Sequence, residues 1–244
     1  MVSIGVLCRD YNICIVHMIE PIFVDDTLTL YHTNMENIIN DLSFNYIITD
    51  PPYNVGYKYP NYNDNMPSHE YIKMIAFLKP YKTIMIHYPE DFCGDIRDAM
   101  GRPTKMVSWI YNSNLNRQHR AIAWFNCKPD FNLVKQPYKN PNDKRIKKLI
   151  EDGSTGSRLY DWWNINLVKN VSKEKISTFT NQIPYEVLER IILTTTKEGD
   201  TILDPFFGSG SLYFVCKKHN RKCIGIEQSK NHIDSFYERL EREQ

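Results

Sequence analysis

The chain lacks the features that mark several large classes of protein. No apolar run among its 244 residues approaches the eighteen or so residues that cross a bilayer. The first seventeen residues look apolar, but Arg9 and Asp10 interrupt them, which argues against the core of a signal peptide. We therefore expect a protein without a membrane partner, located in the cytoplasm or in a compartment continuous with it.

The cysteines also show no pattern that is typical of disulfides or metal sites. The six cysteines include no C-x-x-C pair, and no histidine cluster stands beside them at zinc-finger spacing. Reduced and mostly buried thiols are favoured over disulfides or metal ligands, so we expect no metal site. The composition is otherwise that of an ordinary globular protein, and the length suits one domain with a modest insertion.

The net charge of +1 conceals an uneven distribution. Residues 102–149 contain eleven Lys or Arg and two acids, so this stretch carries +9 and leaves −8 for the remainder. A basic middle in an otherwise acidic chain is typical of a local surface that binds a polyanion. The alternative is a solvated basic surface that has no partner.

Strands and helices alternate along most of the chain, which predicts an α/β fold with a mostly parallel sheet. After Lys128 the apolar periodicity fades, and we interpret residues 128–178 as an insertion into a single domain that spans residues 1–244. Residues 1–17 are an additional segment, which makes Met18 an alternative start. The predicted elements are strand Thr27–His32, helix Met35–Leu42, strand Phe44–Thr49, helix Ser68–Leu78, strand Thr83–Tyr88, helix Glu90–Met100, strands Lys105–Tyr111 and Ala121–Asn126, helix Tyr185–Thr196, strand Thr201–Leu203, helix Ser211–His219, strand Lys222–Ile226 and helix Asn231–Glu241.

The first motif with chemical content is Asp50-Pro51-Pro52-Tyr53. It directly follows a predicted strand, and ligands of open α/β sheets bind at that end of the strands. The two prolines fix the backbone and remove two N–H donors. The Asp50 carboxylate and the Pro51 carbonyl can each accept an N–H of an exocyclic amine, and Tyr53 can stack on the base that carries it. The alternative is a rigid turn after a strand.

The second motif is Asp204-Pro205-Phe206-Phe207-Gly208-Ser209-Gly210-Ser211, between a predicted strand and a predicted helix. Its glycines allow the backbone to approach a ligand closely, and the helix N-terminus favours a negative group. Tyr213 stands where a dinucleotide-binding fingerprint has its third glycine, and the Gly-Lys-Ser/Thr of a P-loop is missing. Glu227, after the next predicted strand, can accept hydrogen bonds from ribose hydroxyls; a surface acid is the alternative.

With these two motifs, the chain resembles the amino-methyltransferases of DNA, the N6-adenine and N4-cytosine family. It resembles the permuted class, in which D-P-P-Y precedes F-x-G-x-G, from about Thr27 to Leu240. The resemblance implies the Rossmann-like fold of the S-adenosylmethionine-dependent methyltransferases with helices on both faces of the sheet, S-adenosylmethionine as cofactor and double-stranded DNA as substrate. It implies a catalytic set of Asp50, Pro51, Pro52 and Tyr53, and a cofactor-binding set of Asn34, Asp50, Gln182, Asp204, Phe206, Gly208, Gly210, Ser211 and Glu227.

Two cofactor segments depart from the usual pattern of this family. Asn34 stands where the family usually has the Asp of Gly-Asp beside the cofactor adenine, and it can still form a hydrogen bond there. The segment Phe179–Pro184 resembles the motif H-P-x-Q-K-P and keeps its glutamine as Gln182, but Ile183 replaces the lysine. An ionic role for that lysine therefore does not transfer to this chain.

DNA contacts are expected from two basic stretches. Arg117–Arg120 resembles the segment near the flipped base, where the family often has His-Glu, so that Arg120 reverses the usual charge. The second stretch lies in the insertion, which we interpret as the target-recognition segment; solvated loop lysines, and a turn histidine at His119, are the alternatives. The residues expected to bind DNA are Arg117, His119, Arg120, Lys135, Lys139, Lys144, Arg145, Lys147 and Lys148, with Tyr138, Asn140 and Asn142 as candidates to reach base edges.

The resemblance implies methyl transfer from S-adenosylmethionine to the exocyclic amine of a base that is flipped out of the duplex. In this family an Asp before Pro-Pro-Tyr favours adenine N6 and a Ser favours cytosine N4, so adenine is the predicted base and cytosine the alternative. An RNA adenine methyltransferase, which would resemble D-P-P-W, and a catalytically inactive nucleic-acid-binding partner subunit are further alternatives. The resemblance also suggests a homodimer and is compatible with a companion restriction endonuclease.

Overall fold

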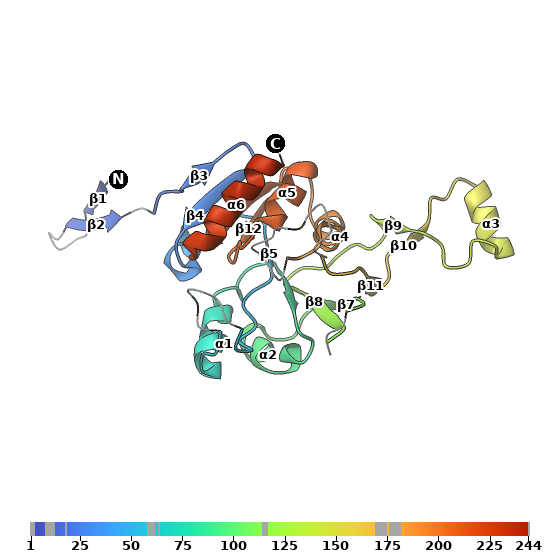
Figure 1. The fold of residues 1–244 in the computed structure, drawn as a ribbon, viewed down its shortest axis with the longest axis horizontal. Coiled ribbons are helices and arrows are strands. Elements are labelled where there is room, and N and C mark those ends of the chain that lie inside the picture. The colour runs from blue at the N-terminus through green and yellow to red at the C-terminus, as the bar shows by residue number, and fades with distance from the viewer. Residues whose placement is uncertain are drawn as a thin grey trace.

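The computed structural model describes residues 3–7, 13–17, 19–57, 62, 64–113, 117–168, 175 and 182–243, so that Met18 and Phe179 lie outside the described residues. Its centre is a nine-stranded sheet with the strand order β11-β7-β8-β6-β5-β12-β13-β4-β3 (Figure 1). Only the β6–β8, β7–β8 and β3–β4 pairs are antiparallel, so this sheet is mostly parallel, as predicted. Its strands are β3 (Phe23–Val24), β4 (Leu28–His32), β5 (Tyr46–Thr49), β6 (Thr83–His87), β7 (Lys105–Ile110), β8 (His119–Phe125), β11 (Trp162–Asn164), β12 (Thr201–Asp204) and β13 (Lys222–Glu227).

Helices cover both faces of the sheet, because successive strand side chains point to opposite faces. On β5, Ile48 packs in one hydrophobic cluster and its neighbour Ile47 in the other. The cluster of Ile48 includes α4, α5 and α6, and the cluster of Ile47 includes α1 and α2. These helices are α1 (Ser68–Ala76), α2 (Asp95–Met100), α4 (Tyr185–Thr195), α5 (Ser211–Lys218) and α6 (Lys230–Arg242). In the described part of the chain, no helix is long and apolar enough to cross a bilayer.

Two predicted helices differ from those in the structure. Two short 3-10 turns, η1 (Met35–Asn37) and η2 (Ile39–Asp41), replace the helix predicted over Met35–Leu42, because Ile38 between them has φ −139°. The helix predicted over Glu90–Met100 is divided into the 3-10 turn η3 (Asp91–Cys93) and α2, since Gly94 has φ −119° and ψ −124°. Both interruptions come from single residues that leave the helical region of the backbone.

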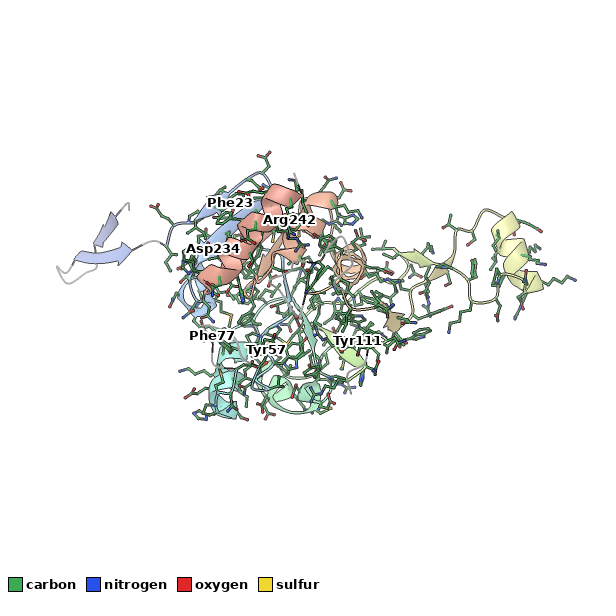
Figure 2. All side chains as sticks on the ribbon, in the orientation of Figure 1. Phe23, Tyr57, Phe77, Tyr111, Asp234 and Arg242 are labelled. Carbon is green, nitrogen blue, oxygen red and sulfur yellow. The ribbon has the colours of Figure 1, made fainter. Side chains whose placement is uncertain are left out.

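Part of the predicted insertion forms an arm that leaves the body of the molecule (Figure 1). At its base, β9 (Lys135–Gln136) pairs with β10 (Ser157–Arg158), and further out lies α3 (Lys144–Glu151). None of the residues of α3 is buried, and Figure 2 shows the side chains of the arm spreading outward. At the N-terminal end, β1 (Ser3–Leu7) and β2 (Ile13–His17) form an antiparallel hairpin that is not part of the central sheet.

Gly225 on β13 provides a test of the packing around the phenylalanine that follows β12. A Cβ built on Gly225 would lie 2.5 Å from Cδ2 of the buried Phe207 ring and 2.9 Å from Cδ1 of Leu30. We expect Gly225→Ala to lower the free energy of unfolding by about 1–3 kcal/mol, the usual cost of overpacking. Thermal unfolding followed by circular dichroism measures this loss. Adding Phe207→Leu should restore part of it, and an unchanged midpoint in the single variant would contradict the packing argument.

Candidate active site

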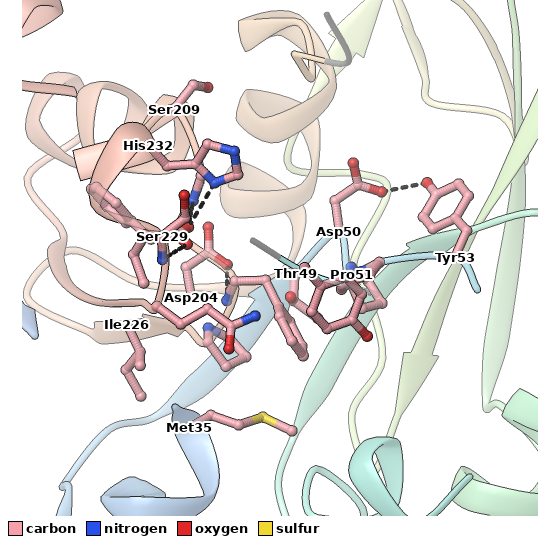
Figure 3. Close-up of a pocket in the computed structure, with 18 of the residues that line it drawn as sticks. Met35, Thr49, Asp50, Pro51, Tyr53, Asp204, Ser209, Ile226, Ser229 and His232 are labelled. Carbon is pink, nitrogen blue, oxygen red and sulfur yellow. Dashed lines mark hydrogen bonds and ion pairs between the residues drawn. The ribbon is translucent and has the colours of Figure 1, made fainter. Parts of the chain in front are cut away.

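A cavity of about 910 Å³ opens at the carboxyl edge of the sheet (Figure 3). Residues that directly follow β4, β5, β12 and β13 line it, because parallel strands present these ends at one edge. The antiparallel strand β8 begins at the same edge and contributes Arg120. The size is within the usual range for a site that encloses a small molecule.

Most of the residues singled out in the sequence meet in this cavity. Those that line it are Asn34, Asp50, Pro51, Pro52, Tyr53, Arg120, Gln182, Asp204, Phe206, Gly208, Ser211 and Glu227. Gly210 is not among the lining residues. It precedes α5 with φ 71°, and a Cβ there would lie 2.5 Å from Cδ2 of Phe236, so the position requires glycine for packing.

The other basic residues singled out lie on the surface. Arg117 and His119 are exposed next to the pocket-lining Arg120, and the Arg117 guanidinium carbon lies 3.9 Å from the Tyr88 ring centroid. The six basic residues of the insertion are all exposed, and they are Lys135, Lys139, Lys144, Arg145, Lys147 and Lys148. They belong to β9, to α3 and to the segment between these elements, so the arm concentrates positive charge outside the cavity.

Asp50 faces the cavity between two partners. Its side chain is 24% exposed, and its Oδ2 lies 3.6 Å from Nη1 of Arg120. The Tyr53 hydroxyl donates a hydrogen bond to Oδ1, and Figure 3 shows this pair as a dashed line. Burial raises the pKa of the Asp50 carboxyl, while the charge of Arg120 and the hydrogen bond from Tyr53 oppose the rise. Burial also raises the pKa of Tyr53 well above its ordinary value, which keeps its hydroxyl a donor.

The loop that carries Asp50 is held by residues that the sequence did not single out. The Tyr53 ring packs on the ring of the fully buried His87, with centroids 4.1 Å apart. The Tyr71 hydroxyl donates a 2.8 Å hydrogen bond to the Pro52 carbonyl and lies 2.9 Å from Nε2 of His87. The position of His87 near the end of a predicted strand was the only signal for this role.

Asp64 fixes the segment that follows the motif. Its carboxylate accepts hydrogen bonds from the backbone N–H groups of Asn54, Val55 and Tyr57, at 2.9, 3.1 and 2.8 Å. Asp64 is 2% exposed, so its carboxylate has lost most of its contact with water. The three N–H donors take the place of the lost water hydrogen bonds. The wall of the cavity after Tyr53 is therefore ordered by one side chain.

Acidic groups dominate the opposite half of the cavity. The Glu227 carboxylate accepts hydrogen bonds from the backbone N–H groups of Gly208 (2.8 Å) and Ser229 (2.7 Å), which ties the glycine turn to the end of β13. Oε1, which accepts from Ser229, keeps a further lone pair for a ligand, whereas Oε2 also lies 3.4 Å from Nδ1 of His232. The Ser229 hydroxyl lines the cavity, is buried, and has no hydrogen-bond partner among the described residues. Among the described residues no group of His, Cys, Asp or Glu could hold a metal ion.

Asp204 predicts an unusual pH dependence of stability. Burial first, and then the charges of Asp50 and Glu227, raise its pKa from 3.8 to about 8. The folded protein then binds this proton more tightly than the unfolded chain does. The contribution of this proton to the free energy of unfolding is therefore fully present below about pH 4 and is lost as the pH rises to 8. We expect the free energy of unfolding of Asp204→Asn to rise relative to wild type by up to about 1.4 kcal/mol per pH unit in this window. Urea unfolding at several pH values measures the difference. If the free energies of unfolding of the two proteins changed in parallel with pH, the result would argue against the raised pKa.

Comparisons with known proteins agree with this geometry. The pattern of the DNA methylase family matches residues 44–238. The chain is 31% identical over 232 residues to the type II methyltransferase M.HpaI of Haemophilus parainfluenzae, covering 84% of this chain and 70% of that protein. It is 28% identical over 260 residues to the type II methyltransferase M.BglII of Bacillus subtilis, covering 92% and 70%.

Two solved structures share the fold. PvuII DNA methyltransferase, described as cytosine-N4-specific, has a TM-score of 0.65 at 16% identity, with 91% of this chain and 89% of that chain covered. A complex of M1.HpyAVI with SAM has a TM-score of 0.55 at 22% identity, with 87% and 99% covered. At these identities the likeness concerns the fold alone.

Proposed function

The chain belongs to the N6 and N4 family of DNA methylases, and from that premise we propose that it methylates the exocyclic N6 of adenine in double-stranded DNA with S-adenosylmethionine as the donor. The observation that carries the proposal is the Asp50–Tyr53 loop, which faces the same cavity as the glycine turn after β12. Adenine is proposed because the motif begins with Asp, which the family resemblance associates with adenine.

The acidic half of the cavity suits S-adenosylmethionine. Its ammonium group calls for an anion, which Asp204 provides once deprotonated, and its ribose hydroxyls call for acceptors, which Glu227 provides. The unpartnered Ser229 hydroxyl and the Asn34 side chain border the same space and offer further hydrogen bonds. When bound, this cofactor supplies a methyl group on a positively charged sulfur.

The Asp50–Tyr53 loop then binds the amine that is methylated. The Asp50 carboxylate and the Pro51 carbonyl each accept one N–H of the amine, which directs the nitrogen lone pair away from the ring and towards the methyl group. The loop is ordered before the base arrives. Tyr53 holds the Asp50 carboxylate, and Tyr71 holds the carbonyl of Pro52, the residue after Pro51. Catalysis comes from this positioning and from acceptors aimed at the nitrogen as it becomes positive.

The base must leave the duplex to reach this site. Asp50 lies within a cavity at the edge of the sheet, and an amine inside the base stack could not approach it. Cytosine N4 is the second candidate, because the family that matches residues 44–238 comprises both N6 and N4 methylases. A homodimer and a companion restriction endonuclease stay predictions.

The proposal is tested by identifying the methylated nucleoside. Purified protein is incubated with labelled S-adenosylmethionine and unmethylated DNA, with RNA in parallel, and the products are digested and identified by mass. N6-methyladenine in DNA is the expected product. N4-methylcytosine would overturn the base, label in RNA alone would overturn the substrate, and absence of both transfer and cofactor binding would point to an inactive partner subunit.

A further inference from the structure

Arg120 is buried in the pocket rather than exposed on a DNA-binding surface, where its grouping with the phosphate-contacting residues had placed it. It is 7% exposed and lines the cavity. On β8 it pairs with Trp109 of β7, and its neighbour Ala121 pairs with His87 of β6. The antiparallel direction of β8 thus brings an early residue of this strand to the edge where Asp50 lies.

The Arg120 guanidinium is held by aromatic rings and one carboxylate. Its central carbon lies 5.3 Å from the Tyr53 ring centroid and 5.4 Å from that of Trp109, and its Nη1 lies 3.6 Å from Oδ2 of Asp50. The Tyr111 hydroxyl and the Arg120 guanidinium interact electrostatically. No described residue accepts a hydrogen bond from either Nε or Nη1, although both atoms are buried.

Buried donors of this kind call for an acceptor, since leaving a charged N–H group without a partner is costly. We propose that Arg120 reads the target base by donating a hydrogen bond to the ring nitrogen next to the exocyclic amine. The inference rests on the proposed function and names the contact by which the same pocket recognises a base with an amine next to a ring nitrogen.

The pocket then presents an acceptor beside a donor. The Asp50 carboxylate accepts from the amine, and the Arg120 guanidinium donates to the neighbouring ring nitrogen. Adenine matches this order with N6 beside N1 or N7, and cytosine matches it with N4 beside N3. Thymine does not match, because it offers a carbonyl oxygen to Asp50.

The cofactor carboxylate is the competing acceptor for Arg120. The strand order argues against it, because β8 lies on one side of β5 whereas β12 and β13, which precede the acidic half of the cavity, lie on the other. Arg120 also packs on Tyr53, which belongs to the base-binding loop. The base side is therefore the occupant to which the geometry points.

The experiment uses duplex DNA in which the mapped target base carries CH in place of one ring nitrogen. The analogues are 1-deazaadenine and 7-deazaadenine, or 3-deazacytosine if cytosine is the methylated base. For wild type, we expect kcat/KM to fall about ten- to a hundredfold on the analogue that lacks the contacted nitrogen. For Arg120→Met, we expect the values of kcat/KM on this analogue and on the parent base to agree to within about threefold.

Controls separate this role from others. Arg97→Met removes an exposed arginine of α2 and should keep the wild-type discrimination. Equal rates of wild type on parent and deaza substrates, or unchanged discrimination in Arg120→Met, would overturn the proposal. A loss of S-adenosylmethionine affinity in Arg120→Met without loss of discrimination would assign Arg120 to the cofactor instead. If wild type methylates no parent DNA, it is the proposed function that fails.

Discussion

Replacing Asp50 by alanine is expected to lower kcat for methyl transfer by about a thousandfold or more. The change removes the carboxylate that receives an N–H of the amine, and it leaves the Tyr53 hydroxyl and the Arg120 guanidinium without their shared partner. Single-turnover transfer of labelled methyl groups to DNA measures the effect. Cofactor binding, measured by calorimetry, should remain largely intact, because the acidic half of the cavity is unchanged.

Two further variants serve as comparisons for Asp50→Ala. Asp50→Asn keeps the shape and one acceptor oxygen but removes the charge, so its activity should lie between those of wild type and Asp50→Ala. Asp98→Ala removes an exposed carboxylate of α2 and should behave as wild type. Substantial turnover by Asp50→Ala would show that the reaction does not depend on this carboxylate.

The second large effect is expected from the arm. Replacing the four basic residues of α3, which are Lys144, Arg145, Lys147 and Lys148, by glutamine should weaken binding to DNA by about a hundred- to a thousandfold near 0.1 M salt. Each phosphate contact adds about 0.9 to the slope of log K against log salt, so the slope should fall by about 3 to 4. Fluorescence anisotropy with labelled duplex over a range of salt concentrations measures both quantities.

The matched control changes the same amount of charge elsewhere. Lysines 73, 79, 197 and 222 are all exposed on the body of the molecule, and their replacement by glutamine should alter the slope much less. Because no residue of α3 is buried, the arm variant should unfold at nearly the wild-type temperature. An equal loss of affinity in the two variants would mean that only the net charge matters.

The meeting of the two motifs could be predicted from the sequence. Asp50 and Asp204 each end or follow a strand within an alternating pattern, and parallel strands share their carboxyl edge. The ends of β5 and β12 were easy to place because both strands are short apolar runs with clear limits. The cavity between them follows from topology more than from any detail of side-chain packing.

Other features could not be predicted, for physical reasons. The burial of Arg120 depends on the antiparallel pairing of β8 with β6 and β7, which no local pattern encodes. Helix α3 has no buried face, so the apolar periodicity that identifies helices was weak there; its start is fixed locally by the Asp143 carboxylate, which accepts the N–H groups of Arg145 and Ile146.

The narrow base of the arm also bears on how such a protein diversifies. The two-residue strands β9 and β10 pair at this neck, and Gly156 is required there because a Cβ would collide with the Gln136 carbonyl oxygen. Residues 137–156 lie beyond this neck, and none of them belongs to the central sheet or lines the cavity. We propose that the arm carries target recognition, so that recognition and chemistry could be inherited separately, with new target sequences acquired by grafting a different arm onto an unchanged catalytic body.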